Sequence, residues 1–216
     1  MAISAGILAR GPWDIEQVHA AWRPDPYEPD RHETHAADLE LDALRRRGSP
    51  SYDGLAARLV NYDAGASGLS LELQPVRWAL RLNPSGGARS LSALTVVRDA
   101  DGRWLAGRRA EWLSSWAGRW ALGAGGAVEV DENPADTLGR ELNEEWSVEA
   151  ERLRVEALVL IPNEMVLLVG QAWLARGAAV TPDDEHDTFA WWPTDIDDWP
   201  PEADPALRRI ARMVDP

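Results

Sequence analysis

The sequence predicts an α/β protein with a small α+β extension at its N-terminus. In the C-terminal part, strand-like segments surround one capped amphipathic helix at about residues 134–146. In the N-terminal part, an isolated amphipathic helix precedes a pair of strands. A chain of 216 residues suffices for one ordinary core with a small addition. The predicted elements fall into an extension, 1–88, and a main domain, 89–216.

The extension contains five predicted elements. Two are weakly marked: a short strand at Ile3–Leu8 and a helix at Trp13–Trp22. A stronger helical pattern covers Arg31–Arg47, where Ala37, Leu41 and Leu44 recur on one face. Two strands follow at Leu55–Tyr62 and Leu69–Leu80, joined by a glycine-containing loop. The Pro- and Gly-containing segment Asn83–Gly87 then reads as a linker.

The main domain begins with a hairpin of strands Ser90–Arg98 and Arg103–Arg109, which turns at Asp99–Gly102. After the central helix, further strands are predicted at Leu153–Leu160 and Met165–Leu174. Asp204 and Pro205 are typical of a helix start, and that last helix runs to Val214.

The central helix carries three closely spaced carboxylates. Asn133 suits its N-cap and Pro134 its first position. Glu141, Glu144 and Glu145 fall at i, i+3 and i+4 and so share one face. A separate apolar stripe can dock on a sheet; it consists of Ala135, Leu138 and Leu142. Close carboxylates repel each other, and a hard cation such as Mg²⁺, which prefers oxygen ligands, removes that repulsion. A solvated acidic face is the alternative for this pattern taken alone.

The wider spacing around the helix resembles a known family motif. The chain reads Gly126-x5-Glu132-x7-Arg140-Glu141-Leu142-x-Glu144-Glu145-x-Ser147-Val148. This resembles the Nudix box, Gly-x5-Glu-x7-Arg-Glu-U-x-Glu-Glu-x-Gly-U, in which U is aliphatic. Ser147 stands where the family has Gly, a position at which a helix often ends in left-handed conformation. Asp131 replaces another family Gly just before the helix.

The resemblance implies an α/β/α sandwich with a mixed sheet, and a box that holds Mg²⁺ or Mn²⁺ against a diphosphate. Glu141, Glu144 and Glu145 would be metal ligands together with the backbone carbonyl of Gly125. Gly126 would let the backbone approach metal or substrate closely. Arg140 would orient the catalytic carboxylates.

Two residues outside the box are further candidates. Arg109 ends a strand that in the family closes with a similar Arg, and it would bind substrate phosphate; a solvated strand end is the alternative. Glu185 lies in an acidic loop before Trp191, similar to a family segment whose Glu serves as general base or extra ligand. A solvated loop is the alternative there, and Glu144 is an alternative catalytic proton acceptor.

Composition restricts the function. The chain has no Cys, which excludes disulfides, thiolate metal sites and a Cys nucleophile. Its net charge of −14, without a basic cluster, disfavours nucleic acid as substrate or partner. All 22 basic residues are Arg, so any cationic phosphate contact is a guanidinium. Most of the 12 Trp are expected in the core, with one of Trp112, Trp116 and Trp120 free to stack on a base. We expect no membrane span and no signal peptide, hence a cytoplasmic protein.

The sequence thus predicts a Nudix hydrolase in which a metal-activated water attacks a phosphorus of a nucleoside diphosphate linked to another moiety. The extension faintly resembles that of enzymes acting on nucleotide sugars, which favours UDP-glucose or ADP-ribose as substrate. A non-catalytic nucleotide-sugar sensor and an interaction protein remain alternatives. The oligomeric state stays open, with a homodimer as one option.

Overall fold

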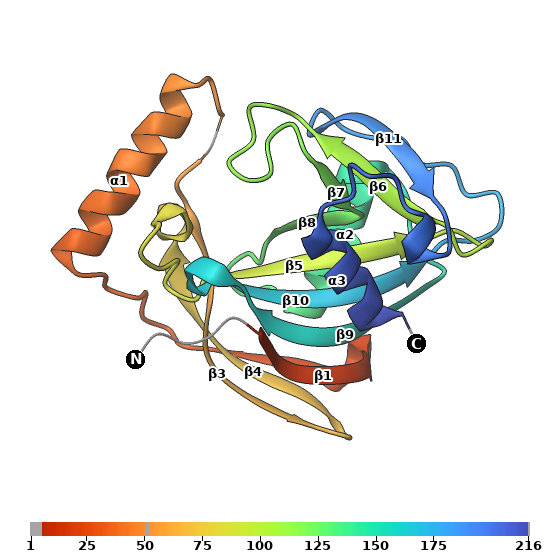
Figure 1. The fold of residues 1–216 in the computed structure, drawn as a ribbon. Helices are drawn as coiled ribbons and strands as arrows, with labels where there is room; N and C mark the ends of the chain where they lie inside the picture. Colours follow the sequence, from red (N-terminus) through yellow and green to blue (C-terminus); the bar gives the residue numbers. More distant parts are fainter. Residues whose placement is uncertain (1–5, 51, 216) are drawn as a thin grey trace.

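The computed structural model describes residues 6–50 and 52–215, which form two sheets and three α-helices (Figure 1). The helices are α1 (Arg31–Arg46), α2 (Pro134–Trp146) and α3 (Pro205–Val214), with short 3-10 segments η1 (Ile15–Gln17), η2 (Trp78–Leu82), η3 (Pro162–Glu164) and η4 (Ile196–Asp198). The strands are β1 (Gly6–Asp14), β2 (Val18–Trp22), β3 (Leu55–Gly65), β4 (Gly68–Arg77), β5 (Leu91–Arg98), β6 (Trp104–Arg109), β7 (Trp120–Leu122), β8 (Ala124–Ala127), β9 (Arg152–Leu160), β10 (Val166–Trp173) and β11 (His186–Trp192).

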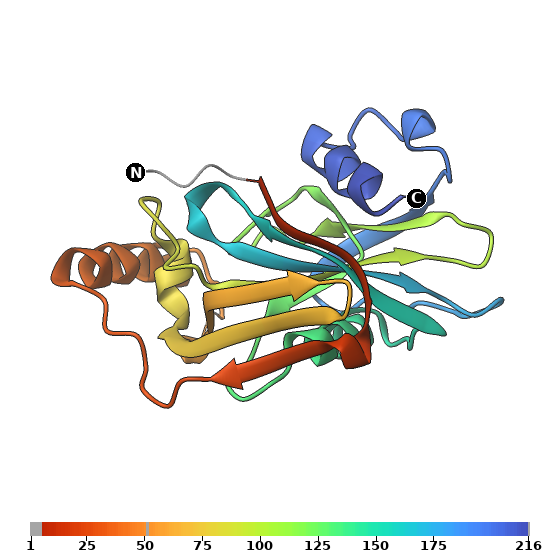
Figure 2. The same ribbon diagram turned by 90° about the horizontal axis from the view of Figure 1, so that it is seen from below.

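The large sheet has eight strands in the order β1-β9-β10-β5-β6-β11, with β7 paired to β6 and β8 paired to β5. It is a mixed sheet, because β10 runs parallel to β5 while its other pairings are antiparallel. Successive residues of β5 point to opposite faces of the sheet. Val96 belongs to an apolar cluster with Leu207 of α3, whereas Val97 belongs to a cluster with Leu142 of α2. Helices α2 and α3 therefore cover opposite faces of this sheet (Figure 2), which confirms the predicted α/β/α sandwich.

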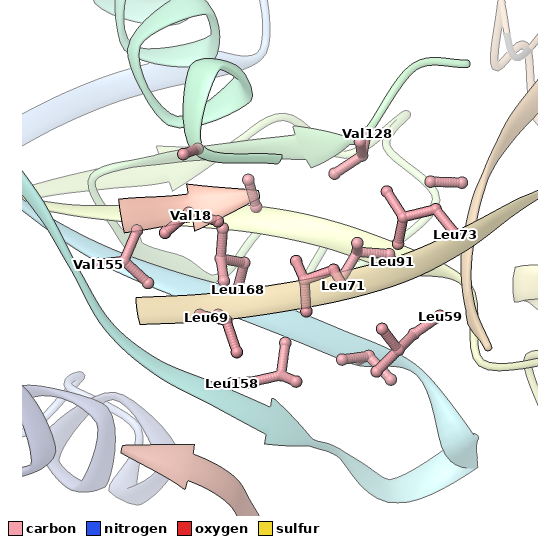
Figure 3. Packing of buried hydrophobic residues seen from close by; sticks show 14 of the residues in the cluster. Val18, Leu59, Leu69, Leu71, Leu73, Leu91, Val128, Val155, Leu158 and Leu168 are labelled. Carbon is pink, nitrogen blue, oxygen red and sulfur yellow. The ribbon is translucent and has the colours of Figure 1, made fainter. Parts of the chain in front are cut away.

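The small sheet, ordered β2-β4-β3, packs against the large one through an apolar interface. Alternate residues of β4, namely Leu69, Leu71 and Leu73, all lie on the buried face. They meet residues of β5, β9 and β10 such as Leu91, Leu158 and Leu168 (Figure 3). Each fully buried Leu contributes about 1.5–3 kcal/mol of transfer free energy, so this interface joins the two sheets firmly.

Helix α1 packs on the side of the small sheet, against η2 (Figure 1). Its start is fixed by a capping box: the Asp30 carboxylate accepts from the backbone N–H groups of His32 and Glu33, and the Glu33 carboxylate accepts from Asp30. The predicted inward residues Ala37, Leu41 and Leu44 are all buried. Ala37 and Leu41 pack in one cluster with Val76 and Leu80, so α1 holds η2 in place.

Strand β3 also donates backbone hydrogen bonds to residues that lie next to β8 and β5 of the large sheet. The Ala57 N–H donates to the Val128 carbonyl at 2.8 Å, and the Leu59 N–H donates to the Arg89 carbonyl at 3.0 Å. Residues before 88 thus reach the loop that follows β8. Within the described residues, no helix has the length and apolar character needed to cross a membrane.

Two of the predicted elements differ from the structure. The helix expected at Trp13–Trp22 is wrong, because Trp13 lies in β1, where it pairs with β9, and Val18–Trp22 pairs in parallel with β4. The strand expected at Leu69–Leu80 ends at Arg77, because Asp53 accepts hydrogen bonds from Arg77 and Ala79 and winds the chain into η2. The expected strand Ile3–Leu8 lies partly outside the described residues, and its last residues belong to β1.

The ends of α2 follow the sequence closely. The Asn133 side chain accepts from the Ala135 N–H at 3.1 Å, which confirms the N-cap. Ser147 caps the other end in left-handed conformation, with φ 51° and ψ 39°. Asp131, the other residue that stands in place of a family Gly, also has a positive φ of 68°. Both positions therefore carry the backbone conformation that Gly adopts most easily.

We expect Ser147→Gly to stabilise the protein by about 0.5–1 kcal/mol. Relief of left-handed strain, roughly 1–2 kcal/mol for a non-Gly residue, exceeds the added entropy of the unfolded chain. Ser147 is exposed, so little packing is lost. Urea denaturation measures the change. Ser147→Ala is the matched control, because it removes the hydroxyl but retains the strain, and it should give no gain. A lower stability of Ser147→Gly would show that the hydroxyl contributes more than the strain costs.

Candidate active site

The three carboxylates of α2 lie at the edge of β8, but they are not equally exposed. The helix docks by its apolar stripe, and Ala135, Leu138 and Leu142 are at most 1% exposed. The Thr95 hydroxyl donates to the Leu138 carbonyl at 2.8 Å, which ties the helix to β5. Glu144 is exposed, whereas Glu141 and Glu145 are buried. A fully solvated acidic face, the alternative considered for this pattern, is therefore wrong for Glu141 and Glu145.

Arg140 connects the acidic residues of the box. Its Nε donates to Glu132 at 2.8 Å, and its Nη1 lies 2.8 Å from Glu141 and 2.9 Å from Glu144. The hydrogen bond to Glu132 is the main reason why the pKa of Arg140 is raised. Burial alone would raise the pKa of Glu132, but hydrogen bonds from Arg140 and from the Glu129 N–H outweigh it and lower that pKa. Arg140 thus contacts Glu132, Glu141 and Glu144, and its role in orienting catalytic carboxylates stays a prediction.

Glu141 faces the Gly125-Gly126 strand. A Cβ at Gly126 would lie 2.2 Å from Glu141 Oε1, so only a glycine leaves room for this carboxylate. Burial raises the pKa of Glu141 to about 7, although Arg140 opposes the shift. The carboxylate is therefore held where its charge is poorly solvated and would be stabilised by an added cation.

Glu145 is the most deeply placed of the three, at 3% exposure. Its Oε1 accepts from the Gly125 N–H at 2.8 Å. Its Oε2 is buried and has no hydrogen-bond partner among the residues that the structure describes. Burial raises the pKa of Glu145 well above the ordinary 4.5. A buried oxygen without a partner is unfavourable, so this atom is available to a ligand.

His186, which the sequence did not single out, covers Glu145 from β11. Its Nε2 lies 3.6 Å from Glu145 Oε2, and its ring stacks on Trp146 at 4.4 Å between centroids. Gly107 makes room for the ring, because a Cβ there would lie 2.2 Å from His186 Cδ2. Burial lowers the pKa of His186, which favours the neutral ring. The only signal in the sequence was its place at the end of the acidic loop.

Arg109 and Glu185 contact each other and line the same cavity as Glu141 and Glu144. The Arg109 Nη2 lies 3.4 Å from Glu185 Oε2, and the Glu185 carbonyl accepts from the Ala110 N–H. Burial raises the pKa of Glu185, and Arg109 opposes the shift. Neither side chain is fully solvated, as a free strand end or loop would be. Both line the cavity that Glu141 and Glu144 also line.

A cavity of ≈ 900 Å³ lies over these side chains. The main domain lines it with the carboxylates Glu141, Glu144 and Glu185, the guanidinium groups of Arg109 and Arg140, and Trp112. The extension contributes a second wall that includes Tyr52, Leu55, Trp78 and Arg81. No pattern in the sequence pointed to these last residues. Of the other two Trp considered for stacking, Trp120 packs on Trp192 at 5.6 Å and neither lines this cavity.

The family resemblance implies a divalent metal, and the donor set can be tested against it. In residues 6–50 and 52–215, no three acidic or His side chains are gathered as a metal-binding group, and Arg140 pairs with two of the expected ligands. Three observations nevertheless fit a hard cation: the unpartnered Glu145 Oε2, the raised pKa of Glu141, and the Gly126 position where a Cβ would collide with Glu141. The ligand roles of Glu141, Glu144, Glu145 and Gly125 stay a prediction.

Comparison with known proteins locates the family match. The model of the NUDIX domain family matches residues 88–212. No curated protein matches the chain. Among solved structures, the MutT protein from Methanosarcina mazei Go1 is 22% identical, with 57% of this chain and 93% of that chain covered and a TM-score of 0.43. The NUDIX domain of Shewanella oneidensis NrtR, complexed with ADP ribose, is 20% identical, with 58% and 87% covered and a TM-score of 0.44.

Arg140 should contribute to stability through its carboxylate partners. We expect Arg140→Met to lower the free energy of unfolding by about 2 kcal/mol at pH 7, because it leaves partly buried carboxylates unpaired. The lowered pKa of Glu132 gives stability that is present above its ordinary value of 4.5 and lost as pH falls through the native value. The penalty should therefore shrink at pH 3, as measured by urea denaturation.

Arg103→Met is the control for this change. Arg103 pairs with Asp99 in an exposed hairpin, and its side chain is 49% exposed, so its removal should cost less than about 1 kcal/mol. An equal penalty for Arg140→Met at pH 7 and pH 3 would contradict the electrostatic role and indicate a loss of packing alone.

Proposed function

The chain belongs to the Nudix family, and on that premise we propose that it hydrolyses a nucleoside diphosphate linked to another moiety. The observation that carries the proposal is the meeting of Glu141 and Glu144 with Arg109 and Glu185 beside one cavity, to which Glu145 is joined through its hydrogen bond with Gly125. Carboxylates that can hold a hard cation, next to a guanidinium that can bind phosphate, suit attack on a phosphoric anhydride.

The cation would be Mg²⁺ or Mn²⁺, held by Glu141, Glu144, Glu145 and the Gly125 carbonyl. When bound, it neutralises diphosphate charge and lowers the pKa of coordinated water. The protein's own groups have separate tasks. Arg140 keeps Glu141 and Glu144 in place through its two short contacts. The Gly125 N–H holds Glu145 by a hydrogen bond to Oε1, and the His186 ring covers Glu145 on the side of Oε2.

In the reaction, the oxygen of water forms a bond to one phosphorus and the anhydride P–O bond breaks. The proton of the water passes to the Glu185 carboxylate, with Glu144 as the alternative acceptor. The raised pKa of Glu185 suits it to accept a proton, because its charged form is poorly solvated. Arg109 binds the phosphate beside it. The products are a nucleoside monophosphate and the phosphate of the other moiety.

A nucleotide sugar such as UDP-glucose or ADP-ribose is the favoured substrate. A volume of ≈ 900 Å³ lies within the range of small-molecule sites and leaves room beyond the diphosphate. Trp78 and Trp112 give the cavity two aromatic walls on which a base or sugar can pack. We propose residues 1–88 as an extension that completes this site. The absence of nucleic-acid partners, the cytoplasmic location and the homodimer option stay predictions from the sequence.

A substrate panel tests this function. We expect hydrolysis of at least one nucleoside-diphosphate sugar, with UDP-glucose and ADP-ribose tried first, dinucleoside polyphosphates and oxidised dNTPs alongside, and phosphate release as readout. Activity should require Mg²⁺ or Mn²⁺ and disappear with chelator. Binding without turnover in a single-turnover assay would indicate a sensor instead. Efficient decapping of long RNA, with nucleotide sugars untouched, would overturn the substrate assignment but leave the family in place.

Glu145→Gln separates metal binding from folding. Gln keeps an acceptor for the Gly125 N–H and removes a poorly solvated charge, so the melting temperature should not fall. Mg²⁺ affinity should drop, and turnover should fall roughly a hundredfold or more. Glu149→Gln, at an exposed position beyond the helix, is the control and should leave both unchanged. Near-normal turnover of Glu145→Gln at saturating Mg²⁺ would remove Glu145 from the site.

A further inference from the structure

Arg81 differs from the other arginines that line the cavity. Arg109 pairs with Glu185, and Arg140 pairs with three carboxylates. Arg81 Nη2 donates to the Ser92 hydroxyl at 2.7 Å, but in the part of the chain that the structure describes no ion pair joins Arg81 to a carboxylate. It is thus a guanidinium on the cavity wall whose charge has no partner of opposite sign in contact.

Such an arrangement is unfavourable without a ligand. Burial lowers the pKa of Arg81 to about 10, so the group remains charged at neutral pH while it is poorly solvated. Glu141 acts on it favourably from a distance and Arg109 unfavourably. Arg81 is half-buried and lines the cavity, so an anion that enters the cavity can pair with its charge.

The position of Arg81 is fixed by the extension. It lies in η2, whose first turn is held by Asp53, an acceptor from both Arg77 Nε at 2.7 Å and the Ala79 N–H at 3.0 Å. The Trp78 N–H donates to the Gly54 carbonyl at 2.8 Å. Buried Ala79 and Leu80 pack in the core formed with α1.

The contact with Ser92 places Arg81 beside the box. Ser92 is on β5 and pairs with Ala127 of β8, the residue after Gly126. The guanidinium is therefore anchored next to the strand that faces Glu141. A diphosphate bound near Glu141 and Glu144 would therefore be attracted by the positive charge of Arg81 as well as by that of Arg109.

We propose that Arg81 binds a phosphoryl group of the diphosphate substrate and that residues 52–82 form part of the substrate site. The inference rests on the diphosphate chemistry of the proposed function. Arg81 is a binding residue: its planar guanidinium can donate two hydrogen bonds to one phosphate, and the phosphate charge replaces the missing carboxylate. The extension, through η2, thereby becomes a determinant of substrate binding.

The test measures binding without turnover. Methylenediphosphonate, which cannot be hydrolysed at its bridge, is titrated calorimetrically into the full chain with Mg²⁺ present, and Mg²⁺ is titrated alone. The variants are Arg81→Met and Arg81→Lys. Arg154→Met is the matched control, because Arg154 is a partly buried arginine of β9 that pairs with Glu156 and does not line the cavity. Melting temperatures of the ligand-free proteins complete the comparison.

We expect Arg81→Met to raise the Kd for methylenediphosphonate about tenfold or more, and Arg81→Lys to restore part of the loss. Mg²⁺ alone should bind Arg81→Met as tightly as the wild type or more tightly, since a repelling cation is gone. The ligand-free melting temperature should not fall for Arg81→Met, whereas it should fall for Arg154→Met with diphosphonate binding unchanged.

Several results would overturn the inference: wild-type affinity in Arg81→Met, an equal loss in Arg154→Met, a parallel loss of Mg²⁺ binding, or no diphosphonate binding by the wild type. The outcome is separable from that of the proposed function. A chain that binds the diphosphonate through Arg81 but hydrolyses no compound of the panel would keep this inference. Hydrolysis with the same kcat/KM in wild type and Arg81→Met would contradict the inference about Arg81 and leave the proposed function in place.

Discussion

Helix α2 buries two carboxylates in the same interface that buries its apolar stripe, and the rest of the site depends on this constraint. Leu138 and Leu142 favour close docking, whereas an ionised Glu141 or Glu145 opposes it, at several kcal/mol for a charge without partners. The chain meets the two demands with backbone and cation contacts. Gly126 leaves space for one carboxylate, the Gly125 N–H donates to the other, and Arg140 compensates the charge at the rim. The same contacts thereby fix how closely α2 packs on the sheet and how the charges of its carboxylates are compensated.

The segment before residue 88 bears on this site because it is hydrogen-bonded to the loop leading into α2. Its β3 donates to the Val128 carbonyl, and the bridge between Ala56 and Glu129 continues that contact. The apolar interface between the two sheets then keeps the extension from rotating away (Figure 3). A rigid attachment of this kind allows η2 to place side chains at a fixed position over the carboxylates. A loosely tethered domain would lose that placement to conformational entropy.

Local signals predicted the parts of the fold that depend on local physics. Asn133 and Asp204 were identified from the sequence as the residues that cap α2 and α3, and periodicity identified the buried faces of α1 and α2. What the sequence could not show is what covers a face once the chain is folded. His186 on β11 covers Glu145, so helical periodicity placed that carboxylate on one face with Glu141 and Glu144 but could not indicate that it is buried. Val18–Trp22 became a strand only because β4 lies beside it, and Arg81 belongs to no local motif.

The groups left without partners have opposite signs, which has a consequence for ligand binding. Glu145 Oε2 has no partner among the described residues and the pKa of Glu141 is raised, so a cation would stabilise both carboxylates. Arg81, by contrast, would be stabilised by an anion. A cation bound first reduces the repulsion between the carboxylates and a diphosphate; a diphosphate bound first brings further oxygen ligands for the cation. Each therefore improves the binding of the other, and by linkage the improvement is the same in both directions. In the ligand-free fold these charges are uncompensated, and in the complex the two ligands compensate them. Substrate and metal together should therefore raise the free energy of unfolding by more than the sum of their separate effects.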